Sequence, residues 1–249
     1  MAIVLSICIP TYQRKGAIAA TLESLIGVLE AHGGEIEACV SDNGSTDGTY
    51  EALGGFAKRC KFIKIRKNEK NLGFDNNLVE ALKMASGEYC WAVGDDTGLV
   101  PSRIGSLVEF IKSKQGGEFM LGIIACNLGA AFKIMGRLFP SDEYSRGEFM
   151  AQYEKYVDEA GMTGSELTGY MSSFLFKRKL AIEACSRIKE HCFGWCHLII
   201  FLHVLSKHEG RVMVYRTPLM ENPATAKPMR EDVLLPGQDG IAVCRAVRE

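Results

Sequence analysis

The chain has 249 residues, 47% of them hydrophobic and 24% charged, and its formal net charge at pH 7 is −1. A balance this close to neutral gives no global basic field, so we expect no nucleic-acid partner. Nine cysteines without a secretory signal indicate reduced thiols, not a disulfide framework. The apolar run at residues 3–9 is too short for a signal peptide or a membrane span, so we expect a cytoplasmic protein.

Strands and helices alternate along the first hundred residues. Short apolar runs bounded by turn-forming residues predict strands at 3–9, 36–40, 61–66 and 89–93. Apolar residues at helical spacing predict helices between them, at 16–31, around Leu53 and Phe56, and along Phe74, Leu78 and Leu82. This alternation predicts a parallel sheet with right-handed crossovers.

The pattern after Pro101 is less regular. It predicts helices at 104–111, 149–157, 177–190 and 196–207, with strands at 120–125, 171–176 and 211–215. Prolines and a glycine at 221–238 predict a mobile loop or tail. No linker is visible, so we expect one domain over 1–249. Its first half would run to about residue 101, its second from 102 to 220, and its tail from 221 to 249.

Two adjacent carboxylates, Asp95 and Asp96, follow the strand predicted at 89–93. Open α/β sheets bind ligands beyond the carboxyl ends of their strands. A divalent cation would offset the repulsion between the two acids, because Mg²⁺ and Mn²⁺ prefer oxygen ligands. The alternative is an ordinary turn, since glycine and aspartate are common in turns.

Polar residues also follow the first strand, in the segment Pro10-Thr11-Tyr12-Gln13-Arg14. Tyr12 offers a flat face for a nucleobase, and Arg14 offers a forked donor for phosphate. A plain strand-to-helix loop with an exposed tyrosine and arginine would look the same in the sequence.

Asp42 ends the second strand, where a carboxylate can accept a hydrogen bond from a base N–H or from ribose hydroxyls. Helix capping explains Ser45 to Asp47 well and explains Asp42 less well. Residues 71–77 (NLGFDNN) hold more amide and acid groups than one cap requires, so Asn71 and Gly73 are candidates for lining a sugar or ribose pocket.

Five short segments together resemble the inverting glycosyltransferases of the family-2 type. They are residues 6–12 (SICIPTY), 40–49 (VSDNGSTDGT), 71–73 (NLG), 87–89 (GEY) and 94–96 (GDD). Their order and spacing match over roughly residues 3–101, and "NLGFDNN" before "VGDD" resembles the O-antigen and capsule transferases. The resemblance implies a GT-A fold, which is a Rossmann-like α/β fold with a mostly parallel sheet flanked by helices and a less regular acceptor-side half.

The resemblance also implies a nucleotide-diphosphate sugar donor and a divalent ion, Mn²⁺ or Mg²⁺. By position, Pro10, Thr11, Tyr12 and Asp42 would surround the base, Asp95 would meet the ribose, and Asp96 would hold the metal. Gly94 stands where many members carry the first acid of an Asp-x-Asp motif. Pro101, five residues after Asp96, keeps the spacing that follows the metal-binding acid in the family.

Many members also carry a Glu-Asp pair at the start of a late helix, and its aspartate is the general base. The comparable segment here, residues 194–198 (GWCHL), has no acid. His197 could be a metal ligand or a base, because imidazole titrates near neutrality. The alternative is a structural histidine. A zinc site combining His191 and Cys192 with Cys196 and His197 does not match a known ligand spacing.

We therefore expect a cytoplasmic glycosyltransferase, which a peripheral contact could bring to the inner face of the membrane. The donor is expected to be UDP- or dTDP-linked, and the acceptor a glycan or lipid-linked hydroxyl in surface polysaccharide synthesis. Lys227 and Arg230 could close over the diphosphate, as mobile lids do. The alternatives are a nucleotidyltransferase that makes nucleotide sugars and a non-catalytic nucleotide-sugar-binding protein.

Overall fold

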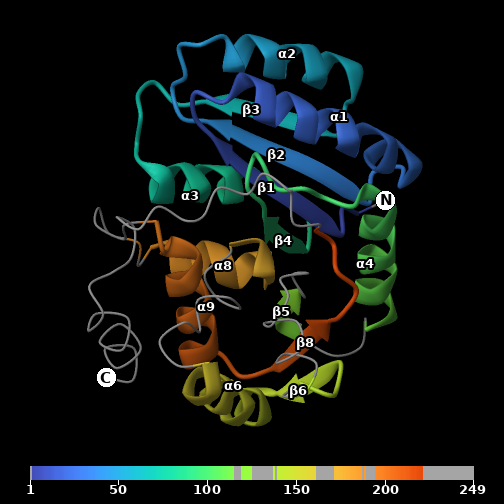
Figure 1. Ribbon diagram of the computed structural model, residues 1–249, viewed down its shortest axis with the longest axis vertical. Coiled ribbons are helices and arrows are strands. Elements are labelled where there is room, and N and C mark those ends of the chain that lie inside the picture. Colours follow the sequence, from blue (N-terminus) through green and yellow to red (C-terminus); the bar gives the residue numbers. More distant parts are fainter. Residues whose placement is uncertain are drawn as a thin grey trace.

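An eight-stranded mixed sheet forms the centre of the protein in its computed structural model, in the order β3-β2-β1-β4-β7-β5-β8-β6 (Figure 1). The structure describes residues 2–114, 119–124, 137, 139–160, 171–186, 188 and 194–220, with the backbone alone at 124 and 156–160. The strands are β1 (Leu5–Thr11), β2 (Ile36–Asp42), β3 (Ile63–Lys67), β4 (Tyr89–Ala92), β5 (Phe119–Ile124), β6 (Glu143–Ser145), β7 (Phe174–Lys177) and β8 (Arg211–Tyr215).

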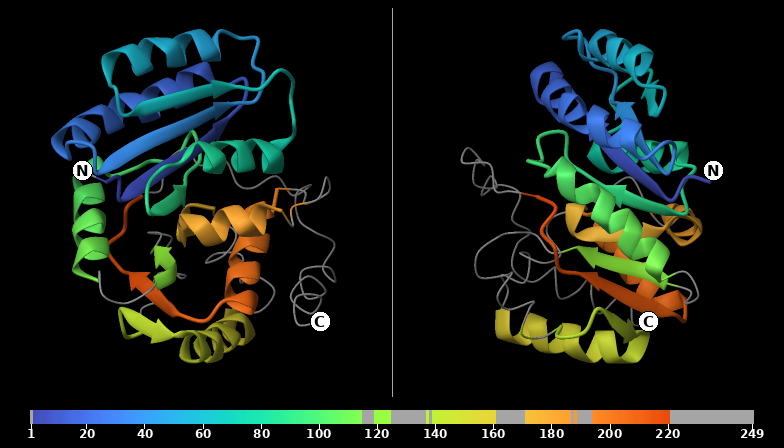
Figure 2. Two further views of the ribbon diagram at one scale, coloured as in Figure 1. Left: turned by 180° about the vertical axis from the view of Figure 1, so that it is seen from behind. Right: turned by 90° about the vertical axis from the view of Figure 1, so that its right-hand side faces the viewer.

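The first half is parallel, as predicted: β1 pairs with β2 and β4, and β2 pairs with β3. The second half is mixed. Strand β7 runs antiparallel to both β4 and β5, β5 is parallel to β8, and β6 is antiparallel to β8. Figure 2 shows the two halves at opposite ends of the molecule, with α1 and α2 at one end and α6 and β6 at the other.

The helices cover both faces of this sheet. They are α1 (Lys15–Ala31), α2 (Thr49–Arg59), α3 (Phe74–Met84), α4 (Pro101–Ser113), α6 (Arg146–Ala160), α8 (Arg178–Cys185) and α9 (Cys196–Lys207), with a 3-10 turn at Met171–Ser173. No helix among these described residues has both the length and the apolar character needed to cross a membrane.

Alternation along the strands divides the core into two layers. Ile7 and Trp91 point to the layer under α1, α2 and α4, whereas Cys8 and Cys90 point to the layer under α3, α8 and α9. The inward-facing residues of β1 and β4 on the α3 side are small, so this helix packs closely against the sheet. Because β1 is parallel to its neighbours and buried on both faces, most of its consecutive residues are apolar.

Two predicted elements are corrected. The helix expected at 177–190 ends at Cys185, with Ser186 as its C-cap. The strand expected at 171–176 starts as a 3-10 turn, and only Phe174–Lys177 is extended. In that turn the Ser172 carbonyl accepts a hydrogen bond from the buried Trp91 indole N–H at 2.8 Å, so this backbone oxygen serves a side chain and not a neighbouring strand.

Candidate functional site

The loops after β1 and β4 meet at the carboxyl edge of the sheet. Thr11 at the end of β1 donates its hydroxyl to Asp95 Oδ2 at 2.7 Å, and Thr21 of α1 donates to the Asp95 backbone carbonyl at 2.9 Å. Burial raises the pKa of the Asp95 carboxyl, and the Thr11 hydroxyl and the Arg14 charge partly offset this effect. Asp95 is thereby fixed in place by two elements other than its own.

Arg14 pairs with both acids of the Asp95-Asp96 segment. Its Nη1 lies 3.3 Å from Asp95 Oδ1, and its Nη2 lies 2.6 Å from Asp96 Oδ2. The partial burial of Arg14 alone would lower its pKa, but the two carboxylates outweigh it and raise the pKa. The Asp96 side chain is 56% exposed and that of Asp95 only 7%. Asp96 is therefore the accessible oxygen donor, and a guanidinium supplies its positive partner in this structure.

This donor set fits a hard divalent ion. The guanidinium shows that the position beside Asp96 accepts positive charge, and carboxylate oxygen suits Mg²⁺ or Mn²⁺. A Cβ added at Gly94 would lie 2.9 Å from Thr97 Oγ1 and 3.3 Å from Asp96 Oδ1. Residue 94 therefore lies directly against Asp96, and Thr97 fills the space that a side chain at 94 would need.

Asp42 is completely buried at the end of β2. Its carboxylate accepts a hydrogen bond from the Ser45 hydroxyl and two at 3.3 Å from the Ser45 backbone N–H. Ser45 Oγ in turn accepts from the Gln13 backbone N–H at 2.8 Å. The carboxylate thus holds the turn that follows β2 against the loop after β1.

The capping expected of Ser45, Thr46 or Asp47 is seen only for Asp47. The N-cap of α2 is Gly48, which makes no side-chain cap bond and has a left-handed φ of 85°. Asp47 Oδ1 accepts from the Thr49 backbone N–H at 3.0 Å. Ser45 and Thr46 bond instead to Gln13 in the loop after β1.

Asparagines connect the loops at this edge. Asn43 Nδ2 donates to Asn71 Oδ1 at 2.9 Å and to the Gly73 carbonyl at 3.2 Å. Asn77 Nδ2 donates to the carbonyls of Thr11 and Ser41 at 3.2 and 3.0 Å. Asn71 and Gly73 thus lie at the expected edge, where these polar groups bind protein partners and fix the positions of the loops.

Aromatic side chains flank the edge. Among the described residues, Tyr12 and Phe74 are the large hydrophobic side chains that remain exposed. Tyr12 follows β1, as expected for a base-stacking residue, with Pro10 and Thr11 buried in the strand beneath it. Phe74 was expected to share the buried stripe of Leu78 and Leu82, but it begins α3 and faces solvent. The helical spacing alone could not separate it from the core positions.

His197 occupies the second position of α9 and is only 3% exposed. Its ring packs against the rings of Phe174 and Trp195, with centroids 6.0 and 5.9 Å away. The cation paired with Asp96 is Arg14, from the other half of the chain. Because of its two ring contacts, His197 lies in an aromatic layer at the start of α9.

Asp75 fixes the start of α9, a role that the sequence did not indicate. Its Oδ2 accepts from the Gly194 backbone N–H at 2.8 Å, and its Oδ1 accepts from the Cys196 N–H at 3.0 Å. Because Asp75 lies in the first turn of α3, these bonds bring the head of α9 to the carboxyl edge of the sheet. His197 is therefore on the same edge as Asn71 and Gly73.

Three expectations fall partly or wholly outside the described residues. Of the four residues weighed as a zinc site, His191 and Cys192 lie outside them, whereas Cys196 and His197 are buried. Lys227 and Arg230, expected as a lid, also lie outside them, and so does the whole segment 221–249, expected as a mobile loop or tail.

Sequence comparison identifies related proteins. The profile of "Glycosyl transferase family 2" matches residues 6–179. An abequosyltransferase of Salmonella typhimurium is 39% identical over 111 residues, which are 44% of this chain and 33% of the relative. An uncharacterized glycosyltransferase of Haemophilus influenzae is 34% identical over 90 residues, which are 36% of this chain and 28% of the relative. The chain thus matches about a third of the length of these curated relatives.

Solved structures share the fold. S. aureus TarS 1-349, in complex with UDP-GlcNAc, gives a TM-score of 0.66 at 17% identity, covering 98% of this chain and 65% of that chain. The mannosyltransferase PcManGT from Pyrobaculum calidifontis, in complex with GDP-Man and Mn²⁺, gives 0.60 at 15% identity, covering 93% and 59%. At these identities the likeness shows the fold, and it confirms the GT-A expectation.

Proposed function

The chain belongs to glycosyl transferase family 2, and on that premise we propose that it transfers a sugar from a nucleotide-diphosphate sugar to a hydroxyl acceptor with inversion. The observation that carries the proposal is the Arg14-Asp95-Asp96 cluster. It lies where β1 has β2 on one side and β4 on the other, so the order of the strands reverses there. Such a switch point is where open α/β sheets bind nucleotides.

The nucleotide would lie across the loops after β1 and β2. The exposed ring of Tyr12 would stack on the base. The carboxylate of Asp95, which Thr11 holds in position, would bind the ribose. Asp42 would accept from a pyrimidine N3–H, which favours UDP- or dTDP-linked sugars. In the structure the Asp42 carboxylate is hydrogen-bonded to Ser45, so this contact with the base requires the turn at Ser45 to shift.

The main requirement of the reaction is to stabilise negative charge on the diphosphate. Negative charge develops on the leaving diphosphate as the acceptor oxygen displaces it at the anomeric carbon. Asp96 would hold the divalent ion, which when bound supplies Lewis-acid stabilisation of that charge. The Arg14 guanidinium, released from Asp96, can donate to the phosphate oxygens in the forked manner typical of arginine.

The acceptor side belongs to the second half of the chain. We propose His197 as the base that removes the acceptor proton, because Asp75 anchors the head of α9 at the same edge as the nucleotide loops. The acceptor would be a glycan or lipid-linked sugar in surface polysaccharide synthesis, in line with the O-antigen-type motifs. A lipid-linked acceptor would bring the protein to the inner face of the membrane through a peripheral contact.

Product analysis tests the function. The protein is incubated with UDP-, dTDP- and GDP-sugars, Mn²⁺ and a lipid-linked saccharide, and nucleoside diphosphate release and glycan mass are measured. The proposal predicts a glycan enlarged by one sugar and one nucleoside diphosphate released per transfer. Pyrophosphate from a nucleoside triphosphate and a sugar phosphate would identify a nucleotidyltransferase. Binding of the donor without any release would indicate a non-catalytic binding protein.

A further inference from the structure

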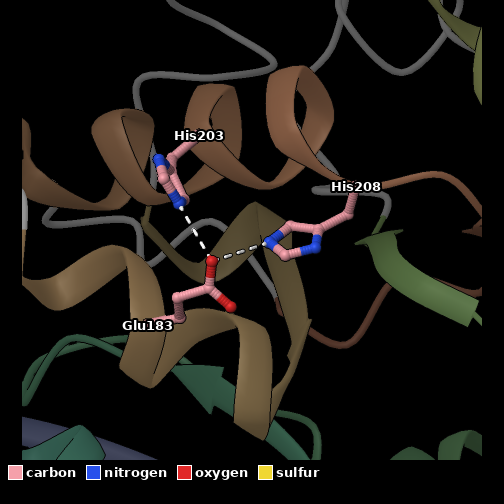
Figure 3. Close-up of side chains that lie close together, drawn as sticks. All are labelled: Glu183, His203 and His208. Atoms are coloured by element: carbon pink, nitrogen blue, oxygen red, sulfur yellow. Dashed lines mark ion pairs between the residues drawn. The ribbon is translucent and has the colours of Figure 1, made fainter.

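We propose that Glu183, His203 and His208 form a second metal site, for a borderline divalent transition metal such as Zn²⁺, at the end of α9 away from the nucleotide edge. Figure 3 shows the two histidine rings converging on the Glu183 carboxylate from α9 and from the segment after it. One ligand atom from each residue lies within 4.8 Å of the other two. The five segments that carry the family resemblance and the proposed transfer reaction do not use these residues.

The distances suit a metal better than direct contact. His208 Nε2 lies 3.4 Å from Glu183 Oε1, and His203 Nε2 lies 3.8 Å from the same oxygen. A separation of 3.8 Å is too long for a hydrogen bond. In a tetrahedral site with bonds of about 2.0–2.2 Å, neighbouring ligand atoms are about 3.3–3.6 Å apart. The separation between His208 and Glu183 already lies in this range, and the separation between His203 and Glu183 exceeds it by about 0.2 Å.

The ligand types select the class of metal. Two imidazole nitrogens and one carboxylate oxygen suit Zn²⁺ and its first-row neighbours, whereas Mg²⁺ and Mn²⁺ favour all-oxygen sites. The side chains of His203 and His208 are 11% and 21% exposed, and that of Glu183 is 52% exposed. The nitrogens are thus largely shielded, and the carboxylate side is open for an ion to enter and for water to complete the coordination.

Regular structure orients the histidines. His203 lies in the last turns of α9, and His208 is the C-cap residue, whose backbone N–H donates to the Val204 carbonyl at 3.2 Å. Their rings make an edge contact with centroids 6.1 Å apart. Glu183 comes from α8, which shares the hydrophobic core with α9. The ligand atoms therefore come from two packed helices and from the residue that caps one of them, and they do not depend on a long loop.

The position of the site suggests a structural role. His203 is seven residues after Cys196, about 10 Å further along the helix at 1.5 Å per residue. Asp75 ties the other end of α9 to α3. A metal at Glu183, His203 and His208 would tie the far end of α9 to α8 and so hold this helix at both ends. Because it binds the native arrangement, the metal should raise the stability of the fold.

Binding of Zn²⁺ and Co²⁺ to the metal-free protein, without nucleotide, tests the proposal. We expect one equivalent of Zn²⁺ to raise Tm, and bound Co²⁺ to give the intense visible bands of a four-coordinate site without thiolate charge-transfer absorption. Glu183→Gln and His208→Gln should each weaken binding by about 10- to 100-fold or more, since even outer partners of metal ligands have effects of this size.

His32→Gln is the matched control. His32 Nδ1 lies 3.8 Å from Glu35 Oε2, so it is a partly buried histidine that faces one glutamate without a second imidazole. This variant should bind Zn²⁺ as the unmodified protein does. Unchanged Zn²⁺ affinity in folded Glu183→Gln and His208→Gln would overturn the proposal, as would Co²⁺ spectra dominated by thiolate. Glu183→Gln changes an exposed side chain, so it remains informative if His208→Gln fails to fold.

Discussion

Arg14 and Asp96 form an ion pair, with Nη2 and Oδ2 2.6 Å apart, that connects the loop after β1 to the loop after β4. Asp96 is also the accessible carboxylate to which the metal is assigned in the proposed mechanism. The guanidinium and the divalent ion therefore compete for one oxygen donor. Donor binding would resolve this competition, because the diphosphate gives Arg14 a new anionic partner.

Arg14→Gln should separate these two roles. Without nucleotide, Mn²⁺ should bind up to about fivefold more tightly, because an exposed ion pair is worth about 0.2–1 kcal/mol. The Mn²⁺-dependent affinity for UDP should fall about tenfold or more, since a bond to a charged group contributes about 1.5–3 kcal/mol. Titration calorimetry measures both. Arg59→Gln, which removes the exposed pair with Glu23, is the control, and equal effects in both variants would contradict the assignment.

Asp42→Asn should weaken UDP binding by about tenfold or more if the carboxylate accepts from the base. The same change also disturbs the turn held by Ser45, so affinity must be compared with Tm. Ser45→Ala is the matched variant, because it removes the hydroxyl that closes Asp42 and leaves the carboxylate. UDP affinity that is normal in Asp42→Asn, or lost equally in Ser45→Ala, would limit Asp42 to holding the turn.

The nucleotide edge could be predicted from the sequence because the polar segments follow strands whose parallel direction is indicated by the alternation of strands and helices. Thr11, Arg14, Asp95 and Asp96 meet because parallel neighbours end at the same edge. The order of the strands, and the antiparallel direction of β7, could not be predicted in this way. An apolar strand can be buried beside any neighbouring strand, so its sequence does not identify its partner. The pairing depends on contacts between residues that are distant in the sequence.

Single side chains were harder to predict than elements. The spacing of Phe74 fits the buried stripe of α3, but its place in the first turn leaves it exposed. Asp75 belongs to the polar segment 71–77, but its partners are backbone N–H groups more than a hundred residues away. The hydrogen bonds of Asn43 and Asn77 likewise join residues that are 28 to 66 positions apart, and no local pattern encodes them.

The buried Glu37 carboxylate should make the stability of the fold depend on pH. Burial alone would raise the pKa of its carboxyl, but Lys64, the Ser6 hydroxyl and Ser86 outweigh burial and lower it from the ordinary 4.5. A lowered folded-state pKa stabilises the fold above the unfolded value, and this contribution is lost as the pH falls through the folded value. Glu37→Gln should therefore reduce unfolding free energy by about 1.5–3 kcal/mol at neutral pH.

Denaturant unfolding across the pH range tests this expectation. The difference between the unmodified protein and Glu37→Gln should be full above pH 4.5 and shrink below it. Glu23→Gln, at an exposed ion pair, should have a much smaller effect at every pH. A difference for Glu37→Gln that does not change with pH would show that the charge of Glu37 does not stabilise the fold.

His197 should act on the transfer step. His197→Ala is expected to lower Tm, because it empties a buried aromatic contact with Phe174 and Trp195. His197→Phe keeps an aromatic ring without a base. If His197 is the base, both variants should bind the donor normally and lose about 10²–10⁴-fold in transfer rate. Weakened Mn²⁺-dependent donor binding in both would indicate a metal ligand, and normal transfer by His197→Phe would leave a structural role.

The most direct test of the proposed site is the affinity of UDP for the unmodified protein and for Asp96→Asn, measured by calorimetry with Mn²⁺ and with excess chelator. The proposed site predicts Mn²⁺-dependent binding that Asp96→Asn abolishes, while its Tm stays close to that of the unmodified protein because the side chain is exposed. UDP binding that is equally tight in chelator, or unchanged in Asp96→Asn, would contradict it.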